Sequence, residues 1–303
     1  MNSNSSINAY SGKRIKLSKV FIHLVLIIMC VGIVLSFLMV IGASLQSEKE
    51  IQTLGFRIFP KKLSFDAYNS VFHNPATLLR SYYVTFITTI IGAFLGTLFT
   101  AGYAYALSRR DFKYRKMLNW LNIISLLFNG GLVATYIVMT QWYHLKNSSW
   151  VLILPLIFSP WTVIMMKSFF SSLPFSIIES AKLDGAGEYR IFFNFVIPMS
   201  KPIVATIALF LTLVMWNDYQ QSLLYITDEG LYKLQYLLMK ILNDMTFLNT
   251  TAAEMGVNLE GMVFPTSSLR MAMCIIVAGP ILFVFPFFQK YFAKGISLGG
   301  VKG

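Results

Sequence analysis

No charged residue occurs in VFIHLVLIIMCVGIVLSFLMVIGASLQS, residues 20–47, close to the start of the chain. An α-helix needs about 20 apolar residues to cross a hydrocarbon core about 30 Å thick, and this stretch supplies them. The segment must be helical because lipid offers no hydrogen-bond partner to an exposed backbone. We therefore predict a membrane-spanning helix over residues 20–45.

The same absence of charge recurs five more times along the chain. Hydrophobic residues make up 56% of the 303 residues and charged residues 13%, against about 45–50% and about 25% in a soluble domain. A soluble core cannot hide so much apolar surface. The sequence thus predicts an all-α integral membrane protein with six transmembrane helices that contact membrane lipid. The further stretches are residues 81–108, 117–145, 147–166, 202–227 (interrupted by Asp218) and 271–289.

Basic residues set the expected orientation. The segment RRDFKYRK, residues 109–116, lies between the second and third predicted spans and holds five Lys and Arg residues. Short cytoplasmic loops carry an excess of such residues, so we expect both termini to be cytoplasmic. The formal net charge of +12 then follows from membrane topology and gives no support to a nucleic-acid partner.

The spans divide the chain into segments on alternate sides of the membrane. Within the expected external loop, LYKLQYLLMKIL (residues 231–242) has apolar residues at a helical period, which predicts an amphipathic helix at the outer face. In order, we expect a cytoplasmic N-terminal arm (1–19), the first transmembrane helix (20–45), an external segment (46–80), a core domain of five transmembrane helices (81–290) with a cytoplasmic loop (179–202) and an external loop (228–270), and a cytoplasmic C-terminal tail (291–303).

The cytoplasmic loop, ESAKLDGAGEYRIFFNFVIPMSKP (residues 179–202), has the pattern of a stiff helical hairpin. Its first four residues can form one helical turn, which Asp184-Gly185 then breaks because Gly185 tolerates a left-handed backbone. Residues 186–195 can form a second short helix. Pro198 and a second proline four residues later end that helix and direct the chain back into the membrane. A hairpin of this kind is suited to docking into another protein.

This loop resembles the EAA loop of ABC-importer permeases, whose pattern is E-A-A-x-x-x-G followed about nine residues later by I-x-L-P. Ser180 in place of Ala, and Ile197 in place of Leu, are mild departures from that pattern. The D-G-A of residues 184–186 and the K-P of residues 201–202 resemble the sugar-importing members more narrowly. The matching positions are Glu179, Ser180, Ala181 and Gly185, then Val196, Ile197 and Pro198.

Three other segments carry the same resemblance. The C-terminal QKYFAKGISLGGVKG, residues 289–303, resembles the tail of the smaller permease of the maltose transporter. FNGGLVATY (residues 128–136) and MWNDYQQSLLYI (residues 215–226) resemble a subgroup named after lipopolysaccharide biosynthesis. Members of that subgroup import complex oligosaccharides that often contain uronic acids. The resemblance extends over residues 20–303.

The resemblance implies a type I importer permease in a bacterial cytoplasmic membrane, crossed several times by this chain. The partners implied are a second homologous permease, two ATPase subunits and an extracellular or periplasmic sugar-binding protein that delivers an oligosaccharide. The EAA loop would be the cytoplasmic coupling helix that follows closure of the ATPases. No G-x-x-x-x-G-K-[ST] motif occurs in the chain, so ATP and Mg are expected on the partner ATPase, with no cofactor and no enzymatic activity in this subunit.

The resemblance also assigns residues that contact the ATPase. Glycines in the tail would let it enter a narrow seam between the two ATPases. For the coupling loop we expect Glu179, Ser180, Ala181, Asp184, Gly185, Ala186, Phe192 and Pro198, and for the tail Gly295, Gly299 and Gly300.

Candidates for the substrate path come from polar residues in predicted spans. Asp218 is the only acid within a span, and ionisable groups inside a membrane commonly mark functional sites. It could contact substrate, pair with the partner permease or meet water at a cavity rim. Trp216, Tyr219 and Gln220 share a face if the helix continues past Asp218, and we expect that face to line the path. Asn217 is a further candidate.

Asn129, with the two glycines that follow it, is expected to break the third span near its middle. An interrupted helix could line a path, because irregular backbone survives at membrane depth only where it is buried or wet. Small residues could equally serve close helix packing. Both readings are open from the sequence.

Two other functions use similar helices. An ion-coupled secondary transporter or channel subunit would need charge relays or repeats across several spans, whereas one intramembrane acid is present. An intramembrane enzyme would need paired catalytic groups at matching depth, and we find none. The three histidines have no ligand spacing, so no metal site is expected.

Overall fold

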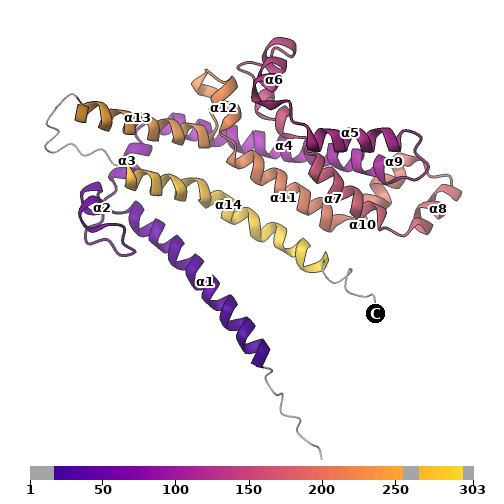
Figure 1. The fold of residues 1–303 in the computed structure, drawn as a ribbon, viewed down its shortest axis with the longest axis horizontal. Coiled ribbons are helices and arrows are strands. Elements are labelled where there is room, and N and C mark those ends of the chain that lie inside the picture. Colours follow the sequence, from indigo (N-terminus) through magenta and orange to yellow (C-terminus); the bar gives the residue numbers. More distant parts are fainter. Residues whose placement is uncertain (1–16, 255–265, 296–303) are drawn as a thin grey trace, which may run out of the picture.

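The computed structural model describes residues 17–254 and 266–295, and every regular element in these residues is helical (Figure 1). The α-helices are α1 (Leu17–Ser44), α2 (Glu48–Leu54), α3 (Asp66–Val71), α4 (Pro75–Ser108), α5 (Arg115–Leu127), α6 (Gly131–Ile137), α7 (Pro160–Ser171), α8 (Phe175–Leu183), α9 (Glu188–Ile191), α10 (Ile197–Met199), α11 (Lys201–Asn217), α12 (Gln220–Tyr225), α13 (Leu234–Glu254) and α14 (Ser267–Gly295). Short π- or 3₁₀-helical turns are η1 (Val138–Trp142), η2 (Ser149–Leu152), η3 (Leu154–Leu156), η4 (Phe192–Val196) and η5 (Glu229–Leu231).

Long apolar helices confirm the membrane prediction. In the described part of the chain, α1, α4 and α14 are each long and apolar enough to cross a membrane unaided. Three further pairs meet the same test as bent units: α5 with α6–η1 at 117°, η2–η3 with α7 at 54°, and α9–α10 with α11 at 85°. Counting each pair as one crossing gives up to six spans, which agrees with the predicted six.

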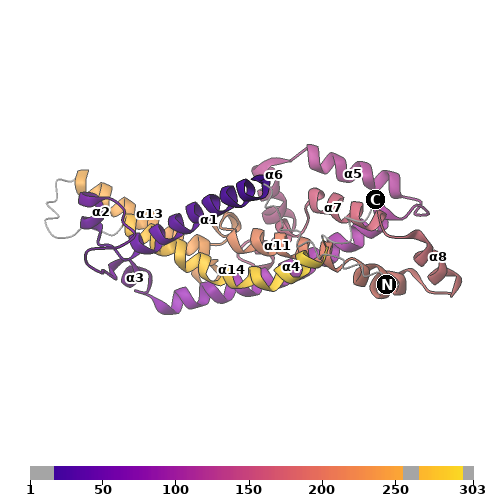
Figure 2. The ribbon, with the colours of Figure 1, turned by 90° about the horizontal axis from the view of Figure 1, so that it is seen from below.

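The bundle is organised around α4, which packs against α7 and α11 (Figures 1 and 2). Two glycines on α4 allow this close approach. A Cβ atom at Gly92 would overlap the Met215 side chain of α11, and one at Gly96 would come within 2.9 Å of Leu211 Cδ1. Small residues at helix interfaces are typical of membrane bundles, where close backbone contact drives association.

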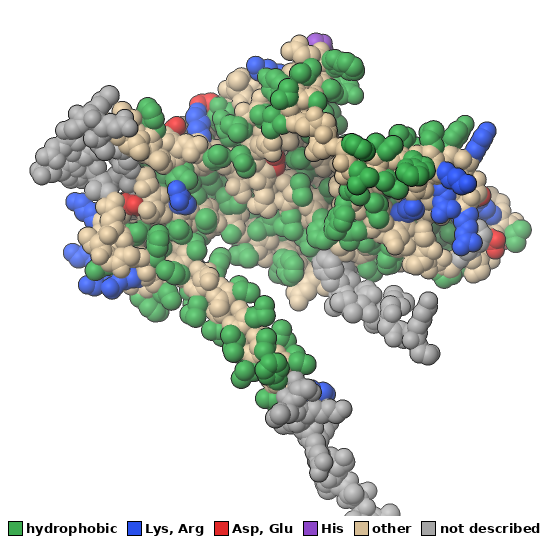
Figure 3. All heavy atoms as spheres, viewed as in Figure 1, with side chains coloured by type: hydrophobic (Ala, Val, Ile, Leu, Met, Phe, Trp, Pro, Cys, Tyr) green, Lys and Arg blue, Asp and Glu red, His purple; other side chains and the backbone are tan. Residues whose placement is uncertain are grey.

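Helix α1 stands away from the rest of the bundle over most of its length (Figure 1), its sequence is apolar on every side, and the face seen in Figure 3 is largely hydrophobic. Helix α1 contacts α14, and just beyond its C-terminal end the carboxylate of Glu48, the first residue of α2, accepts hydrogen bonds from the backbone N–H groups of Ser267 (3.0 Å) and Ser268 (3.1 Å) at the start of α14. A carboxylate at a helix N-terminus satisfies donors that have no intrahelical partner. The surface of α1 is thus left for lipid or another subunit.

The molecule has two distinct ends (Figures 1 and 2). We call the end that carries residues 109–114 and α8–α10 the hairpin end, and the end that carries α2, α3 and α13 the opposite end. Among the described residues, the predicted cytoplasmic segments 109–116 and 179–202 therefore lie at one end, and the helices of the predicted external segments 46–80 and 228–254 lie at the other. Which end faces the cytoplasm stays a prediction. The predicted external segment of residues 46–80 contains the short helices α2 and α3, and the predicted amphipathic helix is α13. Helix α4 begins at Pro75, earlier than the predicted boundary at 81.

Candidate functional site

The hairpin at residues 175–200 follows the sequence pattern closely. Helix α8 ends at Leu183, and Gly185 adopts a left-handed φ of +75°. The N–H of Ala186 donates to the carbonyl of Ala181 at 2.9 Å, which closes the turn. The predicted break at Asp184-Gly185 is therefore confirmed. The second arm, predicted as one helix over 186–195, consists of the short α9, the π-helical turn η4 and α10, which follow one another without a break from Glu188 to Met199. The prediction that Pro198 ends this helix is wrong, because Pro198 is the second residue of α10, where it needs no backbone N–H partner.

The hairpin has a buried face and an exposed face. Ala181 and Phe192 are buried, and the Phe192 ring lies 5.2 Å from the ring of Tyr105 on α4. Ala186 is half-buried. Two large apolar side chains point outward instead, since Leu183 is 89% exposed and Tyr189 84% exposed. Of the coupling residues expected from the sequence, Glu179, Ser180, Asp184, Gly185 and Pro198 are exposed. Whether they contact an ATPase stays a prediction.

Four charged residues form a closed ring where the hairpin meets the end of α4. Lys182 Nζ lies 2.5 Å from Asp111 Oδ2 and 2.9 Å from Glu188 Oε1. Arg109 Nη2 lies 3.0 Å from Asp111 Oδ2 and 3.6 Å from Glu188 Oε1. The Lys182 ammonium, with Arg109, lowers the pKa of the Asp111 carboxyl to about 2, and the two carboxylates raise the pKa of Lys182. We refer to these four residues as the charge ring.

The sequence reasoning missed the charge ring. Its one available signal was Asp111, the single acid within the otherwise basic RRDFKYRK. Asp111 and Lys182 are 71 positions apart in the sequence, and nothing local to either residue indicates that they meet.

The predicted interruption of the third span is also confirmed. Helix α5 ends at Leu127 and α6 begins at Gly131, where φ is +81° and the N–H donates to Asn129 Oδ1 at 2.9 Å. A Cβ atom placed on Gly131 would meet no atom within 4 Å. Close packing within the described chain is therefore not the reason for this glycine.

Beside this break lies a groove of about 550 Å³ that amide side chains line in part. We refer to it as the amide groove. The Oε1 atom of Gln221 is buried and has no hydrogen-bond partner among the residues that the structure describes. Buried polar atoms normally have a partner, so this acceptor suits a donor from outside the chain. The lining residues are Ser125, Phe128, Asn129, Gly130, Gly131, Leu132, Thr135, Pro155, Phe158, Pro160, Gln220, Gln221, Leu224 and Tyr225.

The predicted continuation of the fifth span past Asp218 is wrong. Helix α11 ends at Asn217, and Asp218 has an extended backbone with φ −74° and ψ 122°. Trp216 and Tyr219 therefore do not share a continuous helical face. The indole of Trp216 is buried and donates to the Val277 carbonyl on α14 at 3.1 Å, so it packs inside this chain.

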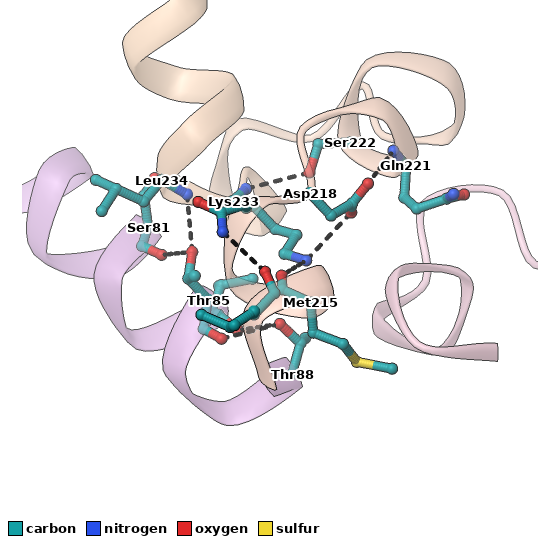
Figure 4. A network of polar contacts seen from close by, with 12 residues as sticks. Ser81, Thr85, Thr88, Met215, Asp218, Gln221, Ser222, Lys233 and Leu234 are labelled. Atoms are coloured by element: carbon teal, nitrogen blue, oxygen red, sulfur yellow. Dashed lines mark hydrogen bonds and ion pairs between the residues drawn. The ribbon is translucent and has the colours of Figure 1, made fainter. Parts of the chain in front are cut away.

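Asp218 has its counter-ion in the same chain (Figure 4). Lys233 Nζ donates to Asp218 Oδ2 at 3.1 Å and to the Met215 carbonyl at 2.5 Å, and its side chain is fully buried. The other carboxylate oxygen accepts from the Gln221 N–H at 3.3 Å, next to the start of α12. The sequence left three alternatives open for Asp218, and none of them was an ion pair within the same chain. Lys233 was not considered because it lies in the expected external loop.

The neighbouring contacts join three elements around this ion pair (Figure 4). The N–H of Lys233 donates to Ser222 Oγ on α12 at 3.2 Å, and the N–H of Leu234 donates to Thr85 Oγ1 on α4 at 2.8 Å. The start of α13 is thereby held to α12 and α4. Asn217, the remaining path candidate, accepts from Gln235 Nε2 at 3.2 Å.

Two further expectations concern the tail and metals. Gly295 is the last residue of α14, whereas Gly299 and Gly300 lie outside the described residues. In residues 17–254 and 266–295, no three His, Cys, Asp or Glu side chains come together as metal ligands.

The sequence profile of the family described as "Binding-protein-dependent transport system inner membrane component" matches residues 91–298. The chain belongs to this family. It is a permease subunit of an ABC transporter, a class of subunit that is not itself catalytic and that works with a partner permease, an ATPase and a substrate-binding protein. The resemblance stated from the coupling loop is therefore confirmed.

Several known proteins resemble this permease along most of its length. Protein LplC of Bacillus subtilis (strain 168) is 40% identical over 270 residues, which cover 89% of this chain and 90% of the relative. The polygalacturonan/rhamnogalacturonan transport system permease protein YtcP of the same organism is 38% identical over 273 residues, covering 89% and 93%. The crystal structure of a bacterial ABC transporter involved in the import of the acidic polysaccharide alginate contains a chain of the same fold. Its TM-score is 0.75 at 23% identity, with 93% of this chain and 99% of that chain covered.

Proposed function

We propose that this permease imports oligosaccharides that contain uronic acids. The relative at 38% identity is a permease for polygalacturonan and rhamnogalacturonan, and polygalacturonan consists of uronic acid units. The amide groove supports the same substrate class. Gln220, Gln221 and Asn129 offer amide groups that both donate and accept hydrogen bonds, as sugar hydroxyls require.

The charge of the amide groove also suits an acidic sugar. None of its described lining residues is Asp or Glu, so a uronate meets no like charge there. The one nearby acid, Asp218, is neutralised by Lys233. Aromatic rings of Phe128 and Phe158 add apolar surface on which the faces of sugar rings can pack.

The hairpin is the proposed coupling helix. It exposes two large apolar side chains, Leu183 and Tyr189, and exposed apolar surface is a common feature of contact sites between proteins. In this proposal one of the two ATPases binds it from the cytoplasm, and the other binds the partner permease, so the hairpin end and both termini are cytoplasmic. A second permease completes the pore in a bacterial cytoplasmic membrane, and an external binding protein delivers the sugar to the opposite end.

The proposal is tested in proteoliposomes that contain this permease, its partner permease, the ATPases and the binding protein. Labelled galacturonate oligosaccharides should accumulate only when ATP and binding protein are both supplied. Gln221→Leu should lower the uptake rate about tenfold, the effect of leaving a polar group of the ligand unpaired. Leu223→Ala is the matched control, because Leu223 lies on α12 but outside the groove.

One result would overturn the proposed function, and another would overturn the assignment of the amide groove to the sugar. Uptake driven by an ion gradient without ATP would favour the alternative of a secondary transporter or channel subunit. Equal uptake by Gln221→Leu and Leu223→Ala, with wild-type activity in both, would mean that the sugar is held elsewhere.

A further inference from the structure

The two arms of the hairpin meet the rest of the chain through different charged residues of the charge ring. Lys182 lies in the last turn of α8, and Glu188 is the first residue of α9. Between them the chain turns at Gly185, whose positive φ is tolerated because glycine has no Cβ atom. Each arm therefore brings one charge, of opposite sign, to the same place.

The end of α4 brings the two complementary charges. Arg109 directly follows α4 and Asp111 lies two residues further on. Because each of the four side chains contacts two of opposite sign, loss of any one breaks two of the four ion pairs. Tyr105, in the last turn of α4, adds a hydrogen bond from its hydroxyl to Glu188 Oε2 at 2.6 Å.

The exposure of these side chains indicates what the charge ring can do. Arg109 is buried, whereas Asp111, Lys182 and Glu188 are 37–52% exposed. Isolated ion pairs at this exposure add little to global stability, but a network with fixed geometry can define the relative position of the elements that it joins. The elements joined here are α8, α9 and α4.

Helix α4 continues from the charge ring to the other polar network of the molecule. Its residue Thr85 accepts the N–H of Leu234, next to the Lys233–Asp218 pair that supports α12. Between the two ends α4 lies against α11 through Gly92 and Gly96. A displacement of α4 at the hairpin end would therefore reach the helix that carries Gln220 and Gln221.

We propose that the charge ring clamps both arms of the hairpin to the end of α4, so that hairpin and α4 move as one body when the ATPases close. Asp111, Lys182, Glu188 and Arg109 are in this view positioning residues for coupling. The inference rests on the proposed coupling role of the hairpin.

The first measurement is the distance between spin labels on the hairpin and on α4, at Ser176→Cys and Phe99→Cys, in the assembled transporter with Cys30 and Cys274 replaced by Ala. Both labelled positions are exposed in this chain, and Ser176 lies outside the proposed ATPase contact. The distribution of distances should have a single narrow peak, at the same position with and without ATP. Lys182→Gln should broaden it, whereas Lys113→Gln, which removes a charge from the same loop outside the ring, should not. An unchanged distance in Lys182→Gln overturns the inference, whatever the transported sugar is.

The second measurement is the amount of sugar imported per ATP hydrolysed. Asp111→Asn and Lys182→Gln should lower this ratio about 5–10-fold, the low end of measured couplings between sites, with ATPase subunits still bound and hydrolysis within about twofold of wild type. Lys113→Gln should leave the ratio unchanged.

A reducible linker separates positioning from a general loss of structure. In an Asp111→Cys/Lys182→Cys protein, on the same background free of native cysteines, a short bis-methanethiosulfonate bridge should restore the ratio, and reduction should lower it again. A ratio that stays at the wild-type value in Asp111→Asn and Lys182→Gln refutes the inference. Absence of sugar uptake by the wild type refutes the proposed function instead, and the spin-label result still decides on the clamp.

Discussion

Breaking the buried pair of Asp218 and Lys233 is expected to destabilise the permease strongly. The Lys233 side chain is fully buried, that of Asp218 is 7% exposed, and Lys233 Nζ lies 3.1 Å from Asp218 Oδ2. Replacing Lys233 by Met leaves a buried carboxylate without its counter-ion, which costs about 3–5 kcal/mol. Replacing Asp218 by Leu costs a similar amount and in addition removes the acceptor for the Gln221 N–H.

The double variant Asp218→Leu/Lys233→Met distinguishes this mechanism from a simple packing defect. Apolar replacement of both members of a buried ion pair is often neutral or stabilising. The double variant should thus be more stable than either single variant, with a coupling energy of several kcal/mol. Asp218→Asn keeps one acceptor oxygen for Lys233 Nζ and should fall between wild type and Asp218→Leu.

The assay is thermal unfolding of the purified permease in detergent. At about 2–4 °C per kcal/mol, the single variants should melt about 6–20 °C below wild type. Glu229→Gln is the matched control, since it breaks an ion pair of similar length with Lys240 whose side chains are 69% and 37% exposed. Such an exposed pair contributes about 0–1 kcal/mol. If Lys233→Met melted within a degree or two of Glu229→Gln, the assignment of Asp218 to a structural ion pair would be refuted.

Three further predictions concern the hairpin and α4. Gly185→Ala forces a side chain into a left-handed conformation, which costs about 1–2 kcal/mol locally, so sugar import per ATP should fall while the permease still inserts; wild-type coupling would show that the turn tolerates it. Gly92→Ala places a Cβ atom against Met215 and should lower the free energy of unfolding by about 1–3 kcal/mol through overpacking. Gly102→Ala is the control and should melt like wild type, because a Cβ atom at Gly102 meets nothing within 4 Å. Equal melting temperatures of the two variants would contradict the close contact of α4 and α11. The neighbouring ammonium and guanidinium groups lower the pKa of the Asp111 carboxyl from 3.8 to about 2. The stabilisation that ionised Asp111 gives to the charge ring is therefore complete above its ordinary pKa and is lost as pH falls through about 2. The hairpin-to-α4 distance should be the same at pH 8 and pH 5, and a change between them would contradict the role of Asp111 in the charge ring.

Much of the architecture could be predicted because its causes are local. A charge-free stretch such as residues 20–47 indicates a helix in lipid whatever else the chain contains, since the backbone must satisfy its own hydrogen bonds there. The break at Gly185 and the interruption after Asn129 depend on the conformational freedom of glycine, which acts within one turn. The hairpin could be recognised as a motif for the same reason, because the residues that define it lie within one short stretch of sequence.

Tertiary structure alone decided which charges meet. Lys233 reaches Asp218 only because α11 ends at Asn217 and the chain continues through α12, and Asp111 reaches Lys182 across 71 positions because the loop after α4 meets the last turn of α8. No helical period or propensity encodes such encounters. The energy of an ion pair depends on burial and on the distance between its atoms, and both are set by how the helices pack.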